Sequence, residues 1–189
     1  MTPVKKVLYC FLMIYGLCSC SKHGDFLYET TAISLGSSDN SGESAKDSVA
    51  SVSSKAYALR LKTHNLVTDY QGPNKDENES GYARKFYLAD LKIYTLTNFD
   101  AGHPANTDIS SYFLYHYSAR YTIGYLLQER IMSYPVTRPN PKTKFDDSYL
   151  FMLMQRPDSS GRYTFRLDLE FSDGSRFTDT TSVTLINEP

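Results

Sequence analysis

Five tyrosines crowd into one short stretch of this 189-residue chain. They are Tyr112, Tyr115, Tyr117, Tyr121 and Tyr125. An exposed tyrosine offers a flat apolar ring with a hydroxyl at its tip, which suits stacking on a sugar or packing against a protein. The alternative is that some of the rings pack in the core while the others reach water with their hydroxyls. The stretch is therefore a candidate binding surface for a glycan or a protein partner.

The histidines are the next candidates for acid–base or metal chemistry. The chain has four, namely His23, His64, His103 and His116. No two lie four residues apart, so the His-Glu-x-x-His pattern of zinc hydrolases is missing. His103 lies between Asp100 and Asp108, so a hydrolytic or metal role is one interpretation of it. The other interpretation is an ordinary loop residue, and it is the one we favour.

Two acidic clusters offer oxygen ligands. One comprises Asp76, Glu77, Asn78 and Glu79, which lack the spacing and the glycine of an EF-hand. The other is Asp146-Asp147, interpreted as the end of a loop before a strand. A solvated loop explains both clusters. The glycine patterns of nucleotide-binding proteins and serine hydrolases are also missing. We therefore predict no catalytic residue, no metal and no cofactor.

All three cysteines lie within the first twenty residues, at Cys10, Cys18 and Cys20. Before the last two come Lys5-Lys6 and an apolar run from Val7 to Gly16. A basic start, an apolar run and a small-residue exit predict a secretory signal peptide. The run is too short to cross a bilayer of about 30 Å as a helix.

The end of this segment resembles the lipobox of bacterial lipoproteins. Leu17 and Ser19 occupy the positions three residues and one residue before Cys20. The resemblance implies cleavage before Cys20 and lipidation of its sulfur and amino group. Cleavage before Cys18 fits less well, because bulky Leu17 would then lie next to the cut. An ordinary secretory signal that happens to end in cysteines is the alternative.

These features divide the chain into three parts. Residues 1–19 are the expected signal peptide, 20–25 a lipidated tether and 26–189 a single domain, with a flexible polar loop at 36–54. Without Lys5 and Lys6 the mature chain carries 18 basic and 21 acidic residues, a net charge of about −3. The charges are interspersed and form no basic stripe, so we expect no nucleic-acid partner.

Alternation of apolar and polar residues predicts an all-β fold. Tyr57, Leu59 and Leu61 alternate with polar residues, as do the apolar residues of 162–171. Asp173-Gly174 then predicts a tight hairpin, followed by a partner strand over 177–186. The spacing favours an immunoglobulin-like antiparallel β-sandwich. We expect one or two short helices as well, one capped by Thr107 or Asp108 and another over 122–131.

Two segments resemble a Bacteroidetes envelope lipoprotein family classed as a domain of unknown function. The first runs from Leu91 through Gly102-His103-Pro104-Ala105 to Ile109. The second is the closing pattern of strand, turn, strand, hairpin and strand from Tyr149 to Ile186. The resemblance implies a β-rich envelope domain and transfers no catalytic residue.

Two functions of different class are compatible with these features. One is a noncatalytic binding module whose loops and tyrosines contact a glycan, a peptide or an envelope protein. The other is a structural subunit of an envelope or fimbrial assembly, joined by β-strand addition. Surface-exported lipoproteins of the resembled group carry acidic residues just after the lipidated cysteine, whereas Cys20 is followed by Ser21, Lys22 and His23. This favours an outer-membrane anchor with the domain facing the periplasm.

Overall fold

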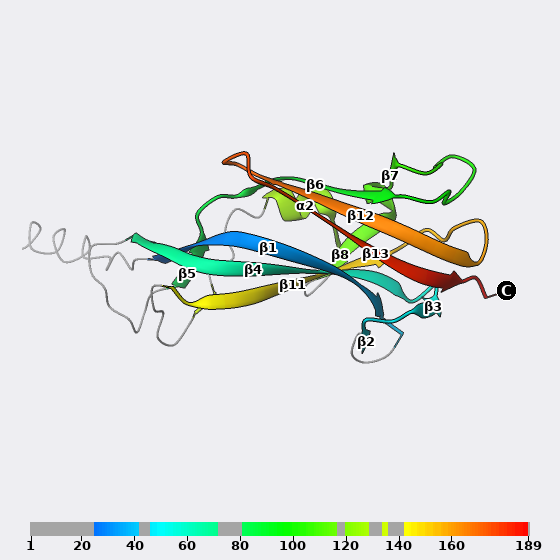
Figure 1. Ribbon diagram of the computed structural model, residues 1–189, viewed down its shortest axis with the longest axis horizontal. Coiled ribbons are helices and arrows are strands. Elements are labelled where there is room, and N and C mark those ends of the chain that lie inside the picture. The colour runs from blue at the N-terminus through cyan, green and yellow to red at the C-terminus, as the bar shows by residue number, and fades with distance from the viewer. Residues whose placement is uncertain are drawn as a thin grey trace, which may run out of the picture.

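The computed structural model describes residues 25–41, 46–71, 81–116, 120–128, 134–135 and 142–188. Two β-sheets form the two layers of the molecule (Figure 1). Buried side chains from both sheets meet between them in a common core. The mainly-β sandwich expected from the sequence is confirmed.

The larger sheet has eight strands in the order β10-β5-β1-β4-β11-β8-β9, with β2 paired to β1. Their bounds are β1 Asp25–Asp39, β2 Lys46–Asp47, β4 Tyr57–Gln71, β5 Gly81–Arg84, β8 Phe113–His116, β9 Arg120–Thr122, β10 Tyr134–Pro135 and β11 Lys144–Leu153. All pairs are antiparallel except β1 with β5, which run parallel. This parallel pair places β5 beside the start of β1, where the candidate site lies.

The smaller sheet has five strands in the order β3-β13-β12-β6-β7. Their bounds are β3 Ser51–Ser53, β6 Leu88–Thr95, β7 Thr107–Asp108, β12 Gly161–Phe171 and β13 Arg176–Ile186. Strands β3 and β13 are parallel and the other pairs are antiparallel. The expected alternation is confirmed in β12, where Tyr163, Phe165, Leu167, Leu169 and Phe171 are all buried. Side chains two residues apart share one face of a strand, so this set faces the core.

The β12–β13 hairpin forms where it was predicted, but its turn differs from the expected one. The Gly174 N–H donates to the Phe171 carbonyl at 2.9 Å, and the Phe171 N–H donates to the Ser175 carbonyl at 2.9 Å. Gly174 has φ +84°, whereas the φ of Asp173 is not positive. A three-residue loop that ends in a left-handed glycine matches the right-handed strand twist with only one residue in that conformation.

The segment 36–54, expected as a flexible loop, contains regular structure instead. Strand β1 continues to Asp39, and β2 and β3 follow, with residues 42–45 outside the described part. Ser37 and Ser38 are buried because their hydroxyls are hydrogen-bonded, Ser37 to Tyr57 at 3.3 Å and Ser38 to Asp47 at 3.0 Å. The polar composition indicated a loop, but hydrogen bonds across the sheet satisfy these hydroxyls.

The two helix predictions have different outcomes. Helix α2 (Ile123–Gln128) lies within the expected 122–131, and residues 129–131 fall outside the described part. The prediction at Thr107–Leu114 is wrong, because β7, a 3-10 turn (Ser110–Tyr112) and β8 form there. The Asp108 carboxylate accepts from the Ser110 N–H at 2.9 Å. This hydrogen bond stabilises a local turn, and the chain does not continue into a longer helix. Among the described residues, no helix is long and apolar enough to cross a membrane.

A carboxylate joins the two sheets along one side. Asp179 on β13 accepts from the Leu35 N–H of β1 at 2.7 Å through Oδ2, and from the Thr180 N–H at 2.8 Å through Oδ1. The hydroxyls of Ser37 and Thr181 lie 3.2 Å apart beside it. These contacts occupy strand edges that would otherwise be open.

Candidate functional site

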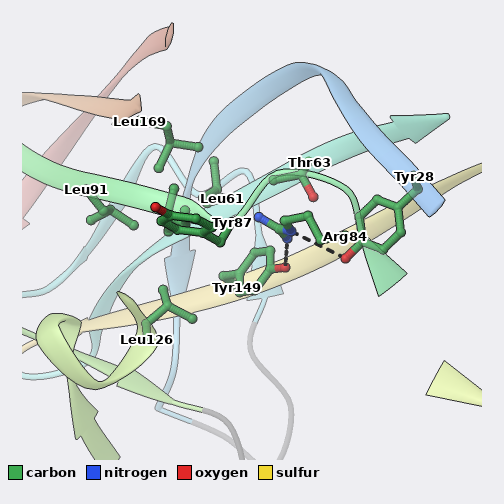
Figure 2. A pocket seen from close by; sticks show the side chains of 10 residues that line it. Tyr28, Leu61, Thr63, Arg84, Tyr87, Leu91, Leu126, Tyr149 and Leu169 are labelled. Atoms are coloured by element: carbon green, nitrogen blue, oxygen red, sulfur yellow. Dashed lines mark hydrogen bonds between the residues drawn. The ribbon is translucent and has the colours of Figure 1, made fainter. Parts of the chain in front are cut away.

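A pocket opens between the two sheets close to the start of β1 (Figure 2). Its apolar wall consists of five leucines, Leu61, Leu88, Leu91, Leu126 and Leu169. They come from β4, β6, α2 and β12, so both sheets and the helix contribute. Branched aliphatic side chains around one hollow make a wall suited to an aliphatic group.

The pocket is narrow. Its free space is about 530 Å³ when counted out to the open mouth, but only about 30 Å³ of it admits the centre of a water molecule. That is room for about two or three waters. Tyr87, which is 49% exposed, lies among the lining residues. A ligand of more than a few atoms therefore needs the lining side chains to move apart.

Among the described residues, one charged side chain lines this pocket. Arg84 ends β5 and is paired in register with Tyr28 of β1. Its Nη2 donates to the Tyr149 hydroxyl at 2.8 Å, and its Nε donates to the Tyr28 hydroxyl at 3.4 Å (Figure 2). The guanidinium carbon also lies 5.6 Å from the centre of the Tyr28 ring and 5.4 Å from that of Phe171. Two hydroxyls and two aromatic rings thus hold the guanidinium in place.

Arg84 has no carboxylate within ion-pair distance among the described residues. Its Nη1 donates to none of them either. The nearest acid in electrostatic terms is Asp147. Asp147 accepts instead from the Asn65 side-chain amide at 3.0 Å, and that amide also donates to the Thr63 hydroxyl at 3.2 Å. Both Asn65 and Thr63 are buried, and Thr63 connects this network to the pocket lining.

Burial and nearby charges raise the pKa values of Arg84, Asp147 and Tyr28. Burial lowers the pKa of Arg84, but the Tyr149 and Tyr28 hydroxyls and Asp147 outweigh this and raise it overall. Burial raises the pKa of Asp147, and Arg84 and Asn65 only partly oppose the rise. Burial also raises the pKa of Tyr28. The site therefore keeps a permanent positive charge at Arg84 beside neutral hydroxyls, which is an arrangement that binds anions.

A second hollow, on the larger sheet, is polar. Arg60 lines it and forms an ion pair with Asp47, and the Arg60 Nε also donates to the Ser38 hydroxyl at 3.2 Å. This arginine therefore already has an ionic partner, whereas Arg84 has none in direct contact among the described residues.

The predicted tyrosine surface is divided by the structure. Tyr115 is only 2% exposed and packs in the core, so it cannot present a binding face. Tyr121 and Tyr125 stack with ring centres 4.2 Å apart and planes 12° apart, and Tyr125 is 39% exposed. The Tyr112 hydroxyl donates to the Asp100 carboxylate, and Tyr117 lies outside the described residues. The five tyrosines therefore do not form one surface.

Tyr112, His103 and Asp100 form a compact hydrogen-bonded group. His103 Nδ1 lies 2.7 Å from Asp100 Oδ1, and the Tyr112 hydroxyl donates to Asp100 Oδ2 at 3.1 Å. The Gly102 N–H donates to the same carboxylate at 2.8 Å. Burial raises the pKa of Asp100, but these hydrogen bonds outweigh it, so that its pKa lies below the usual 3.8. The hydrogen bonds of Gly102 and His103 to Asp100 hold the loop from Asp100 to His103 together. This fits the interpretation of His103 as a loop residue.

The remaining sequence candidates are placed as follows. Asp146 and Asp147 lie within β11, so the interpretation as a loop end is wrong, and Asp146 contacts His64 at 2.8 Å. Cys20 and the acidic cluster at 76–79 fall outside the described residues. Within the described ranges, no group of three or more His, Cys, Asp or Glu side chains could hold a metal ion.

Sequence reasoning missed Arg84. It follows the glycine-rich, acidic segment 71–81, and its hydroxyl partner Tyr149 is 65 residues away in the chain. One signal was available, because Arg84 stands in the aromatic run Tyr82-Ala83-Arg84-Lys85-Phe86-Tyr87. An arginine amid aromatic residues indicates a cation–π environment, although not which strands supply it.

The architecture is that of a two-sheet β-sandwich domain with a narrow pocket between its sheets. The sequence matches the family described as "Domain of unknown function (DUF5034)" over residues 30–182. The match covers most of the chain, and the protein belongs to this family. The resemblance to a domain of unknown function is confirmed at that level.

No curated protein matches the sequence. Among solved structures, the Streptococcus agalactiae AgI/II polypeptide BspA C-terminal domain is similar at 10% identity and a TM-score of 0.26, over 82% of this chain and 49% of that one. A structure titled BspA_C_WT has 11% identity and a TM-score of 0.27, over 82% and 50%. This chain spans about half the length of both. Similarity at this level carries no argument about function.

Proposed function

We propose that this protein is a noncatalytic binding module of the bacterial cell envelope, of the Bacteroidetes lipoprotein type. Lipid on Cys20 holds it to the outer membrane, and the sandwich faces the periplasm. The lipobox-like residues Leu17, Ser19 and Cys20 support the anchor, and the basic and small residues after Cys20 support the periplasmic side.

One observation carries the binding function. Arg84 extends into the inter-sheet pocket without an ion-pair partner among the described residues. Arg84 is partly buried and its direct hydrogen-bond partners are neutral hydroxyls, so part of its charge is removed from water without an ion pair. An anionic ligand would supply that ion pair. The pocket beside it offers the apolar contact that a small ligand needs.

A structural subunit joined by β-strand addition has less support. Strand addition requires a long open edge, whereas in the described part of the chain the terminal strands β10, β9, β3 and β7 comprise only two or three residues each. Short terminal strands are a common means of preventing such pairing.

Intact mass spectrometry of the mature protein tests the anchor. We expect a mature chain that begins at Cys20 with its acyl groups attached. Cys20→Ala should abolish acylation, whereas the matched Cys18→Ala should leave it intact. An unacylated mature protein, or one that begins elsewhere, would contradict the anchor.

A pocket-filling variant tests the binding function. Leu126 lines the pocket from α2, whereas Tyr125 on the same helix is exposed. We expect wild-type protein and Tyr125→Trp to retain a small molecule from an envelope extract, identified by mass spectrometry, and Leu126→Trp to lose it. Equal retention by all three folded proteins, or no retention by any of them, would refute binding in this pocket.

A further inference from the structure

We infer that the ligand of this pocket is a single-chain amphiphile, whose anionic headgroup binds Arg84 and whose aliphatic chain lies among the five leucines. This inference rests on the proposed binding function and names the chemical class of its ligand. The headgroup is a carboxylate or a phosphate, which present the same paired oxygens to a guanidinium.

The hydrogen-bond inventory of Arg84 supports an anionic headgroup. A guanidinium has five N–H donors in a fixed fork. The described residues accept from Nη2 and Nε only, and both acceptors are neutral tyrosine hydroxyls. Nη1 therefore remains for a ligand oxygen, and a charged oxygen there would form the direct ion pair that Arg84 lacks among the described residues.

The surroundings of Arg84 also determine the side from which the anion binds. On its outer side, Arg84 borders a hollow that contains Glu29 and Asp173. These two carboxylates repel an anion on that side, although Lys85 pairs with Glu29 at 2.7 Å. On the inner side, Arg84 is the only charged side chain among the described residues that line the pocket, and the nearby Asp147 carboxylate, which is not part of that lining, accepts from the Asn65 amide. An anion is therefore favoured from the inter-sheet side over the outer side.

The shape of the pocket supports one aliphatic chain. The five leucines present only aliphatic carbon, and the free space between them is narrow. Because the free space holds only about two or three waters, the lining side chains must move apart to admit even one slim aliphatic chain, and two chains or a rigid ring system would need a larger opening still. Burial of each methylene of that chain stabilises the complex.

The expected anchor brings this pocket close to a membrane. Tyr28 lies eight residues after Cys20. A fully extended chain of that length spans at most about 28 Å. With Cys20 held at the bilayer surface, the pocket mouth is thus within reach of amphiphiles that leave the membrane.

Calorimetric titration of the Cys20→Ala protein, which needs no detergent, tests the inference. The probes are decanoate, decyl phosphate, decanol and butyrate. We expect decanoate or decyl phosphate to bind one-to-one at least about tenfold more tightly than decanol, because hydrogen bonds to a charged group are the stronger ones. Butyrate should bind far more weakly than decanoate, since it lacks the chain. Tighter binding of decanoate favours a free fatty acid as the source, and tighter binding of decyl phosphate favours a single-chain lipid with a terminal phosphate.

Variants localise the headgroup. Arg84→Met should weaken decanoate binding about tenfold or more while leaving decanol unchanged. Arg176→Met is the matched control, because Arg176 is 73% exposed and pairs with Glu170 at 3.0 Å away from the pocket. Should Arg84→Met fail to fold, the decanoate-to-decanol ratio of the unchanged pocket decides by itself. Equal affinity for decanoate and decanol, or an effect of Arg176→Met equal to that of Arg84→Met, would overturn the inference.

Failure of the inference is distinguishable from failure of the proposed function. If none of the charged probes is preferred but Leu126→Trp still abolishes retention of an envelope compound, the pocket binds a ligand of another class. If no probe binds and Leu126→Trp makes no difference to retention, both proposals are wrong.

Discussion

The Tyr149 hydroxyl accepts a 2.8 Å hydrogen bond from Nη2 of Arg84, although the two residues lie on strands separated by β1 and β4. Alternation along β11 directs Asp147 and Tyr149 to the same face of the sheet. The Arg84 side chain thus extends from β5 across β1 and β4 to a hydroxyl on β11. The position of the guanidinium in the pocket depends on that hydrogen bond.

Removal of this hydroxyl should weaken the fold and loosen Arg84. Hydrogen bonds to a charged group contribute about 1.5–3 kcal/mol, so Tyr149→Phe should lower the free energy of unfolding by about that amount. The matched control is Tyr163→Phe, whose hydroxyl donates to the neutral Ser159 carbonyl at 2.7 Å, with an expected loss of about 1 kcal/mol. Urea unfolding measures both. A loss for Tyr149→Phe no larger than that for Tyr163→Phe would contradict the role of the charge.

Acid should weaken the loop closed by Asp100. Hydrogen bonds from His103, Gly102 and Tyr112 hold the folded-state pKa of Asp100 below 3.8. A carboxyl whose pKa is lowered by folding stabilises the protein fully above its unfolded pKa, and this contribution is lost as pH falls through the folded pKa. The stability difference between wild type and Asp100→Asn should therefore be largest at neutral pH and shrink below about pH 4.

Thermal unfolding across the pH range measures this difference. Asp90→Asn is the control, since Asp90 forms only an exposed ion pair with Lys92 at 3.4 Å. A pH-independent difference for Asp100→Asn would show that the carboxylate charge is unimportant there.

Loss of the Asp179 carboxylate should open one side of the sandwich. Asp179→Ala removes the acceptor of the Leu35 and Thr180 N–H groups. We expect a loss of about 1–3 kcal/mol in unfolding free energy, because the N–H of buried Leu35 is left unsatisfied. Amide exchange at Leu35 should accelerate. Asp168→Ala, which removes an acceptor from exposed Thr178 on the next strand, should leave Leu35 exchange unchanged.

Substitution of Gly174 and of Gly124 by alanine should change the free energy of unfolding in opposite directions. Gly174 adopts φ +84°, so Gly174→Ala should destabilise the protein by about 1–2 kcal/mol. Gly124 lies exposed in α2, where an added methyl meets only Thr122 Oγ1 at 3.8 Å, so Gly124→Ala should stabilise by up to about 1 kcal/mol. Chemical denaturation measures both. A neutral Gly174→Ala would contradict the assigned turn.

The sequence predicted those parts of the fold that depend on local alternation. In β12, burial follows the period-two pattern from Tyr163 to Phe171, and Gly174 is placed in the turn by its own conformational freedom. The local alternation of apolar and polar residues does not indicate which distant strand a residue will contact. The buried serines at 37 and 38 owe their burial to residues on other strands, so their composition indicated a loop.

The site depended almost wholly on long-range pairing. Tyrosines close together in the sequence were separated in space, because Tyr115 faces the core while Tyr125 lies on a helix surface. Arg84 and Tyr149, far apart in the sequence, were brought together by the order of the strands. Nothing in the local pattern near either residue indicates that order.

The central claim is that Arg84 binds the headgroup of an anionic ligand inside the inter-sheet pocket. Carbon-13 NMR of decanoate labelled at its carboxyl carbon tests this most directly, by measuring the pKa of the bound carboxyl during a pH titration. We predict a pKa below that of free decanoate, because a guanidinium favours the charged form, and a return towards or above the free value in Arg84→Met. A bound pKa at or above the free value in the wild-type protein would show that the carboxyl lies in an apolar environment away from Arg84, and would contradict the claim.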